Sequence, residues 1–86
     1  MSESSNKHLA KVIADVAVFL EFTDADLLDP DTAVDAMEQM ASELQLMGLE
    51  DKMTLTLLFE EISDQFKNPL HKEFVKNLSD SLGIQA

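Results

Sequence analysis

The chain of 86 residues contains no cysteine, no tryptophan, no tyrosine and no arginine. Without cysteine it cannot form a disulfide framework, present a thiolate nucleophile or build a cysteine-based zinc site. Its six lysines are outnumbered by 17 carboxylates, which gives a net charge of −11. Binding to nucleic acid depends on lysine and arginine, and an anionic membrane repels an acidic protein. We therefore expect neither nucleic acid nor a membrane surface among its partners.

Long apolar runs are also missing. No stretch of the chain approaches the ~20 apolar residues that a membrane-spanning helix needs. The first six residues are polar and include no basic residue, which is not the pattern of a secretory signal. The sequence therefore predicts a protein of the cytoplasm.

Helix signals divide the chain into four segments with apolar residues at helical spacing. Asp29-Pro30 and Asn68-Pro69 each place an oxygen-bearing N-cap before a proline. The two glycines are expected to stop helices as left-handed residues. We predict a single all-α domain over residues 6–86, a compact antiparallel four-helix bundle with a short extra turn between helices one and two. The predicted segments are a polar tail at 1–5, helices at 6–20, 30–47, 50–66 and 69–82, and a turn at 23–28.

Helical periodicity also predicts which side chains are buried. Each helix has one face with apolar residues three or four positions apart. The predicted core residues are Leu9, Val12, Ile13, Val16, Phe19 and Leu20 in the first helix, Ala33, Met37, Met40, Leu44 and Met47 in the second, Leu55, Leu58, Phe59, Ile62 and Phe66 in the third, and Leu70, Phe74, Val75, Leu78 and Leu82 in the fourth.

The middle of the chain is strongly acidic, because Lys52 is the only cation between Asp15 and Asp64. Like charges four residues apart on a helix cost about 0.2–0.5 kcal/mol per pair. One interpretation is a solvated face without a specific role. The other is a surface that attracts a cationic protein partner and speeds its association. The residues predicted to form this surface are Glu21, Asp24, Asp26, Asp29, Asp31, Asp35 and Glu38.

Three apolar residues around Gly48 point away from the predicted buried faces. These are Leu46, Met53 and Leu57, and they are predicted to form an exposed patch that contacts a partner. Two alternatives are that they pack against the N-terminal tail or the fourth helix, or that the patch mediates a homodimer.

No catalytic centre, cofactor site or metal site is predicted. The aspartates after residue 23 do not match a calcium-binding loop, which needs a glycine at its sixth position. His8 and His71 have no ligand at metal-binding spacing and are expected at the surface. The chain also lacks a phosphate-binding glycine loop. We therefore predict that the protein is not an enzyme.

Two parts of the sequence carry a resemblance to a family. Residues 19–34 read FLEFTDADLLDPDTAV and continue into MEQMA at 37–41, and the C-terminal part contains NP at 68–69, EFVKNL at 73–78 and SLGI at 81–84. These segments resemble small acidic bacterial immunity proteins, which are encoded beside secreted toxins. The resemblance implies a cytoplasmic protein that binds a cognate toxin and occludes it, with no catalytic residue of its own.

The predicted function is therefore that of an immunity protein. Its acidic residues are expected to contact lysines and arginines of the toxin, and its exposed apolar residues to provide the centre of the interface. The main alternative is a non-enzymatic helical adaptor or homodimeric regulatory protein. A narrower third alternative is a mimic of DNA.

Overall fold

The computed structural model describes residues 3–85, and within them the chain forms helices and no strand. The predicted all-α class is therefore confirmed. The helices are α1 (Glu3–Phe22), α2 (Pro30–Leu44), α3 (Leu49–Ile62), a 3-10 turn η1 (Ser63–Gln65), α4 (Pro69–Lys76) and α5 (Leu78–Ser81). Helix α1 includes residues 3–5, which the sequence analysis assigned to the tail. Met1 and Ser2 lie outside the described residues.

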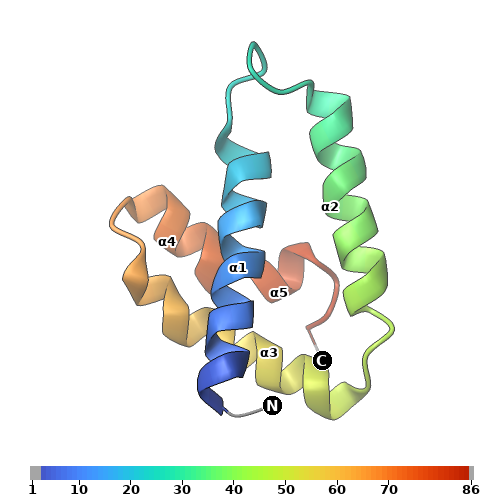
Figure 1. Cartoon of the computed structure of the whole chain (residues 1–86), viewed down its shortest axis with the longest axis vertical. Coiled ribbons are helices and arrows are strands. Elements are labelled where there is room, and N and C mark those ends of the chain that lie inside the picture. The colour runs from blue at the N-terminus through green and yellow to red at the C-terminus, as the bar shows by residue number, and fades with distance from the viewer. Residues whose placement is uncertain (1–2, 86) are drawn as a thin grey trace.

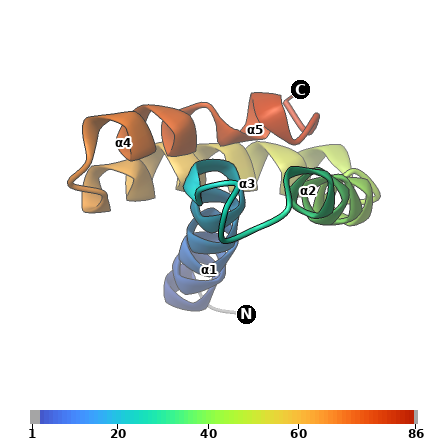
Figure 2. The same cartoon turned by 90° about the horizontal axis from the view of Figure 1, so that it is seen from above.

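The helices cross instead of running along one common axis. Helices α1 and α2 stand next to each other along the long axis of the molecule, and α3 runs across them (Figure 1). Viewed from above, α4 and α5 lie along one side of α3, whereas α1 meets its other side (Figure 2). The antiparallel four-helix bundle is therefore not confirmed. Among the described residues, no helix is both long and apolar enough to cross a membrane.

Both helix starts that were predicted from an N-cap residue followed by proline form as expected. The Asp29 carboxylate accepts a hydrogen bond from the backbone N–H of Thr32 at 3.1 Å and another from its hydroxyl at 3.0 Å. Asn68 caps α4 in the same way, because its side-chain oxygen accepts from the backbone N–H of Leu70 at 2.8 Å. The predicted short turn is also present, with the Asp24 carbonyl accepting from the backbone N–H groups of residues 27 and 28.

Helix α2 ends at Leu44 and α3 at Ile62, each earlier than predicted. Two further features also differ from the prediction. Gly48 has φ −66° and ψ 162° and precedes α3 as its N-cap, so its assignment as a left-handed stop is wrong. The predicted fourth helix is divided at Asn77, whose backbone leaves the helical region with φ −106° and ψ 16°. Its side-chain amide donates to the Glu73 carbonyl at 3.0 Å. This bond competes with continuation of the helix, because it uses a carbonyl of the helix's last turn.

Gly83 does adopt the left-handed conformation, with φ +69°. Its N–H donates to the Asp80 carbonyl, and the N–H of Ile84 donates to the Ser79 carbonyl, which closes α5 in a Schellman motif. The following residue, Ile84, is thereby directed into the core, where it is almost fully buried. Gln45 reinforces this end of the chain, because its amide donates to the Leu82 carbonyl at 2.9 Å.

We expect Gly83→Ala to lower the free energy of unfolding by about 1–2 kcal/mol, because a left-handed conformation is costly for any residue with a Cβ. The new Cβ would also lie 2.8 Å from the Gln45 side-chain nitrogen. Gly48→Ala is the matched control, since its φ suits alanine and no heavy atom lies within 4 Å of the added Cβ. Urea denaturation followed by circular dichroism measures the free energy of unfolding of both variants. An equal decrease in the two variants would contradict the role of Gly83 as a left-handed residue.

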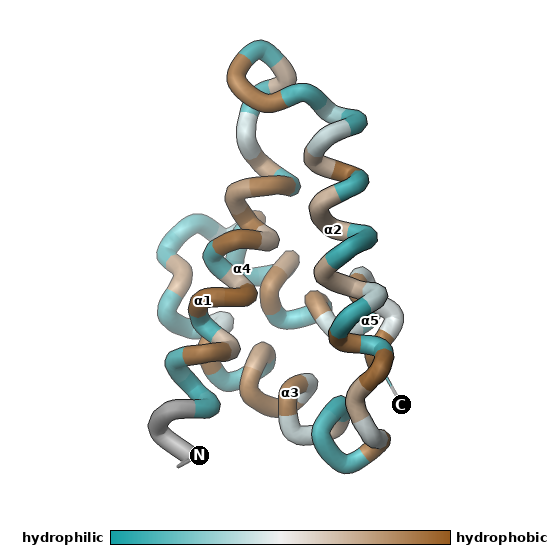
Figure 3. The backbone as a smooth tube through the Cα atoms, turned by 45° about the vertical axis from the view of Figure 1, so that its right-hand side comes forward, coloured by the Kyte–Doolittle hydropathy of each residue, from teal (hydrophilic) through white to brown (hydrophobic). Residues whose placement is uncertain are grey.

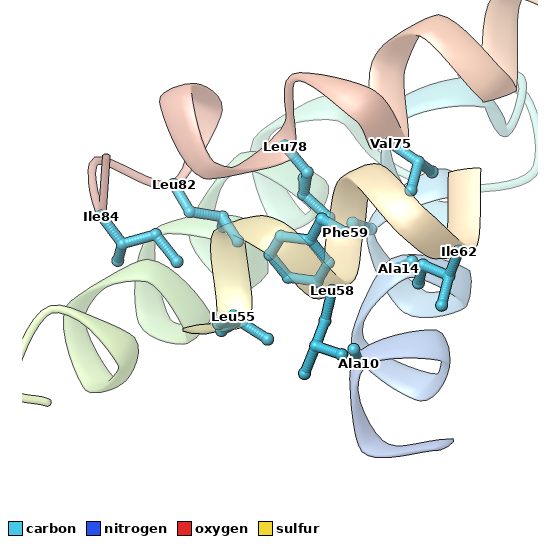
Figure 4. Packing of buried hydrophobic residues seen from close by; sticks show 11 residues of the cluster. Ala10, Ala14, Leu55, Leu58, Phe59, Ile62, Val75, Leu78, Leu82 and Ile84 are labelled. Atoms are coloured by element: carbon cyan, nitrogen blue, oxygen red, sulfur yellow. The ribbon is translucent and has the colours of Figure 1, made fainter. Parts of the chain in front are cut away.

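The core is built around α3. Phe59 and Ile62 from this helix are fully buried against side chains of α5 and the C-terminal end of α4 (Figure 4). Leu55, Leu58, Val75, Leu78 and Leu82 are buried as predicted, whereas Phe66 and Phe74 are half-buried at the edge. Leu70 is 69% exposed, so its assignment to the core is wrong. It lies in the first turn of α4.

Helix α1 buries a different side from the one predicted. Ala10, Ala14 and Ala17 are fully buried, whereas the larger residues on the adjacent side of the helix remain exposed. The crossing with α3 explains the difference: small side chains let two helix backbones approach closely. The predicted core residues of α1 that are exposed instead are Leu9, Val12, Val16 and Phe19, and those that are half-buried are Ile13 and Leu20.

Candidate protein-binding surfaces

The predicted acidic residues are all exposed, and they follow one continuous segment of the chain. Glu21 lies in the last turn of α1, Asp24 and Asp26 lie in the connection to α2, and the others lie at the start of α2 or along it. Asp29 is partly committed to its cap of α2. The remaining carboxylates, Asp31, Asp35 and Glu38, project from a helix whose sequence contains no lysine, arginine or histidine. This face of α2 is therefore uniformly negative.

Leu46 lies two residues beyond the end of α2, next to the same acidic face. Together with Asp35, Glu38 and Ser42 it borders one shallow hollow on the outer side of the helix. Leu46 is 79% exposed. The acidic face of α2 is thus continuous with an apolar residue at the connection to α3.

An apolar patch continues from there along α3. Leu49, Met53 and Leu57 follow at intervals of four residues, so they line one side of the helix. All three are more than half exposed, and Leu57 is 64% exposed. We call Leu46, Leu49, Met53 and Leu57 the α3 patch. Leu49 was missed in the sequence analysis, although its spacing from Met53 and its position next to Gly48 point to it.

The surroundings of the α3 patch are acidic. Glu50 lies three residues before Met53, and Glu60 and Glu61 lie three and four residues after Leu57, so their side chains border the patch on the helix surface. Glu61 is paired with Lys7 of α1, with its oxygen 2.7 Å from the lysine nitrogen. Lys52 borders the patch as well, because it lies three residues after Leu49. The patch therefore combines apolar side chains with a rim in which carboxylates outnumber lysines.

Helix α1 has a second exposed apolar surface. Leu9, Val12, Val16 and Phe19 are spaced by three, four and three residues, which places them in one row, and we call them the α1 stripe. Val12 is 58% exposed and Phe19 is 57% exposed. Figure 3 shows apolar residues recurring along α1 after its N-terminal turns. A monomeric domain of this size rarely exposes two such surfaces, which commonly mark contact sites.

The charges beside the α1 stripe are balanced. The Lys11 nitrogen lies 2.6 Å from an Asp15 oxygen, one turn along the same helix. The same lysine also lies 4.9 Å from the centre of the Phe66 ring. The rim of the α1 stripe is therefore close to neutral, in contrast to the acidic rim of the α3 patch.

A groove of about 320 Å³ lies between α1, the C-terminal end of α2 and the first half of α3. Its walls are mostly apolar, with Asp51, Thr54 and Asn6 as the polar residues. Leu9 belongs both to this groove and to the α1 stripe. The other apolar residues that line it are Ala10, Ile13, Leu44, Met47, Leu55 and Leu58.

The two histidines lie far apart in the chain and in different surroundings. His8 is exposed, whereas His71 is half-buried with its ring 4.5 Å from the ring of Phe22. His71 is therefore a partly covered surface residue that belongs to an aromatic cluster with Phe22 and Phe74. In the part of the chain that the structure describes, no three His, Cys, Asp or Glu residues are grouped so that they could hold a metal ion.

Comparison with known proteins adds no family to this description. No model of a protein family, no curated protein and no solved structure matches the chain. The resemblance to immunity proteins therefore stays a prediction from the sequence.

Proposed function

We propose that this chain is a non-catalytic protein-binding domain that captures a basic partner protein. Its specific form is an immunity protein that binds a cognate bacterial toxin in the cytoplasm and occludes the toxin's active surface. One observation carries the proposal: the acidic face of α2 shares a hollow with the exposed Leu46, and three residues further along the chain the exposed apolar row of α3 begins at Leu49.

The two parts of this surface have different physical roles. Carboxylates on a face without cations attract a basic protein over a distance of about a Debye length and raise its association rate. They contribute less to the lifetime of the complex. Apolar side chains that become buried at the centre of an interface slow dissociation. A basic active site that binds phosphate groups is the kind of surface that such a combination fits.

The test uses the purified chain as bait in lysate from its source organism, at low salt and at high salt. We expect one stoichiometric basic protein to be retained, and we expect the activity of that protein to be blocked when the chain is bound. Retention with unchanged activity would favour the alternative of a helical adaptor. Retention of no basic protein at either salt concentration would contradict the proposal.

Replacing Met53 and Leu57 together with serine is expected to weaken retention of the partner by at least about tenfold. The reason is that truncation of central apolar contacts commonly costs more than about 1 kcal/mol each. Leu70→Ser is the matched control, because Leu70 is an equally exposed leucine on α4, outside the α3 patch. The measurement is the Kd of the retained protein for each variant. A similar loss for Leu70→Ser would show that the α3 patch is not the contact.

A further inference from the structure

The α1 stripe is not needed for the proposed capture of a basic partner, and its surroundings differ from those of the α3 patch. Its rim carries the paired Lys11 and Asp15 instead of a row of carboxylates. We infer that the α1 stripe binds a second copy of this chain, with the two α1 helices antiparallel. This inference is independent of the proposed function.

Charge favours a second copy at this surface over other surfaces. Two copies with a net charge of −11 each repel one another, so they can associate only where the local charge is low. The acidic face of α2 does not meet that condition. The rim of the α3 patch keeps a net negative charge, because Glu50 and Glu60 outnumber Lys52 and Glu61 is paired with Lys7. The α1 stripe does meet the condition, because the lysine and the carboxylate beside it neutralise each other.

Charge also selects the antiparallel orientation. The lysines in the N-terminal half of α1, Lys7 and Lys11, are already paired with Glu61 and Asp15. The C-terminal end of the helix carries Glu21 and leads into Asp24. An antiparallel pair keeps these acidic ends apart. A parallel pair would place the acidic ends together. Antiparallel helix dipoles are favourable as well.

The shape of the stripe is self-complementary in this orientation. The residues repeat at alternate spacings of three and four, as in a coiled-coil seam. Antiparallel pairing about the middle of the row sets Val12 against Val16 of the second copy, and Leu9 against its Phe19. Since Leu9 borders the groove of about 320 Å³, the Phe19 ring of the second copy lies at the mouth of that groove.

The test measures the mass of the full chain by sedimentation equilibrium from micromolar to millimolar concentration. We expect the mass to rise to twice 9.6 kDa. Val12→Lys and Val16→Glu should each keep the protein monomeric, because each buries an unpaired charge in the pair. Both sites are exposed in the single chain, and circular dichroism confirms that each variant is folded. Leu27→Lys is the control and should still dimerise, since Leu27 lies in the loop before α2.

Mixing the two variants tests the orientation. In an antiparallel pair the new lysine of the Val12→Lys chain faces the new glutamate of the Val16→Glu chain, and the two remaining valines face each other. An equimolar mixture is therefore expected to regain the twofold mass, whereas a parallel pair would gain nothing. The inference is overturned if the protein is a monomer at every concentration. It is also overturned if either variant alone dimerises as the original chain does, or if their mixture stays monomeric.

Discussion

Phe59→Ala is expected to lower the free energy of unfolding by about 3–5 kcal/mol, the largest stability effect of any single substitution considered in this chain. Phe59 is fully buried in the middle of α3, the helix that contacts α1, α4 and α5. Removal of its ring leaves a cavity that three helices border. An 86-residue domain is expected to have a total stability of roughly 4–13 kcal/mol. The substitution therefore removes a large share of it.

Leu57→Ala is the matched control for Phe59→Ala. Leu57 lies two residues earlier on the same helix but is exposed. Its replacement should change the free energy of unfolding by no more than about 0.5 kcal/mol. Urea denaturation at low protein concentration, followed by circular dichroism, measures both variants. Similar values for the two would mean that α3 does not bury the side described here.

Reversal of three charges on α2, by Asp31→Lys, Asp35→Lys and Glu38→Lys together, is expected to slow association with a basic partner by about 10- to 1,000-fold. These three residues form the negative face of α2 that has no cation. The effect should be greatest at low salt and should shrink as salt is added, because salt screens exposed charges. Stopped-flow measurement of the association rate, with the protein that the bait retains, tests this at several salt concentrations.

The control for this experiment changes the net charge by the same amount elsewhere. Asp64→Lys, Glu73→Lys and Asp80→Lys replace three exposed carboxylates, in η1, α4 and α5. If the position of the charge matters, this variant keeps most of the association rate. Equal slowing by both variants would mean that only the net charge matters. If neither variant slows association, the acidic residues do not attract the partner, and that part of the proposal is contradicted. The helix content of each variant, from circular dichroism, shows whether the fold is retained.

The candidate surface was predictable only in part. The acidic residues of α2 could be placed on its outer face because helical periodicity and the N-cap at Asp29 set their directions. Leu46, Met53 and Leu57 were identified because they interrupt the apolar pattern of their helices. The α1 stripe was not identified, because Val12 and Phe19 fit a buried helical face as well as the alanines do.

The two helix starts with proline and the turn at Gly83 were determined by the sequence alone. Asp29 and Asn68 cap the helices that follow them, and Gly83 adopts the left-handed conformation that was expected of it. These features depend on hydrogen bonds and backbone preferences within a few residues, so the local sequence contains all the information that they need.

Only the tertiary structure decided how the helices cross and which side of each is covered. Ala10, Ala14 and Ala17 are buried because α3 lies against them, and Ile84 is buried because the turn at Gly83 directs it back toward the core. These outcomes depend on contacts between residues far apart in the chain. Helical periodicity restricts such contacts to a few arrangements but does not choose among them.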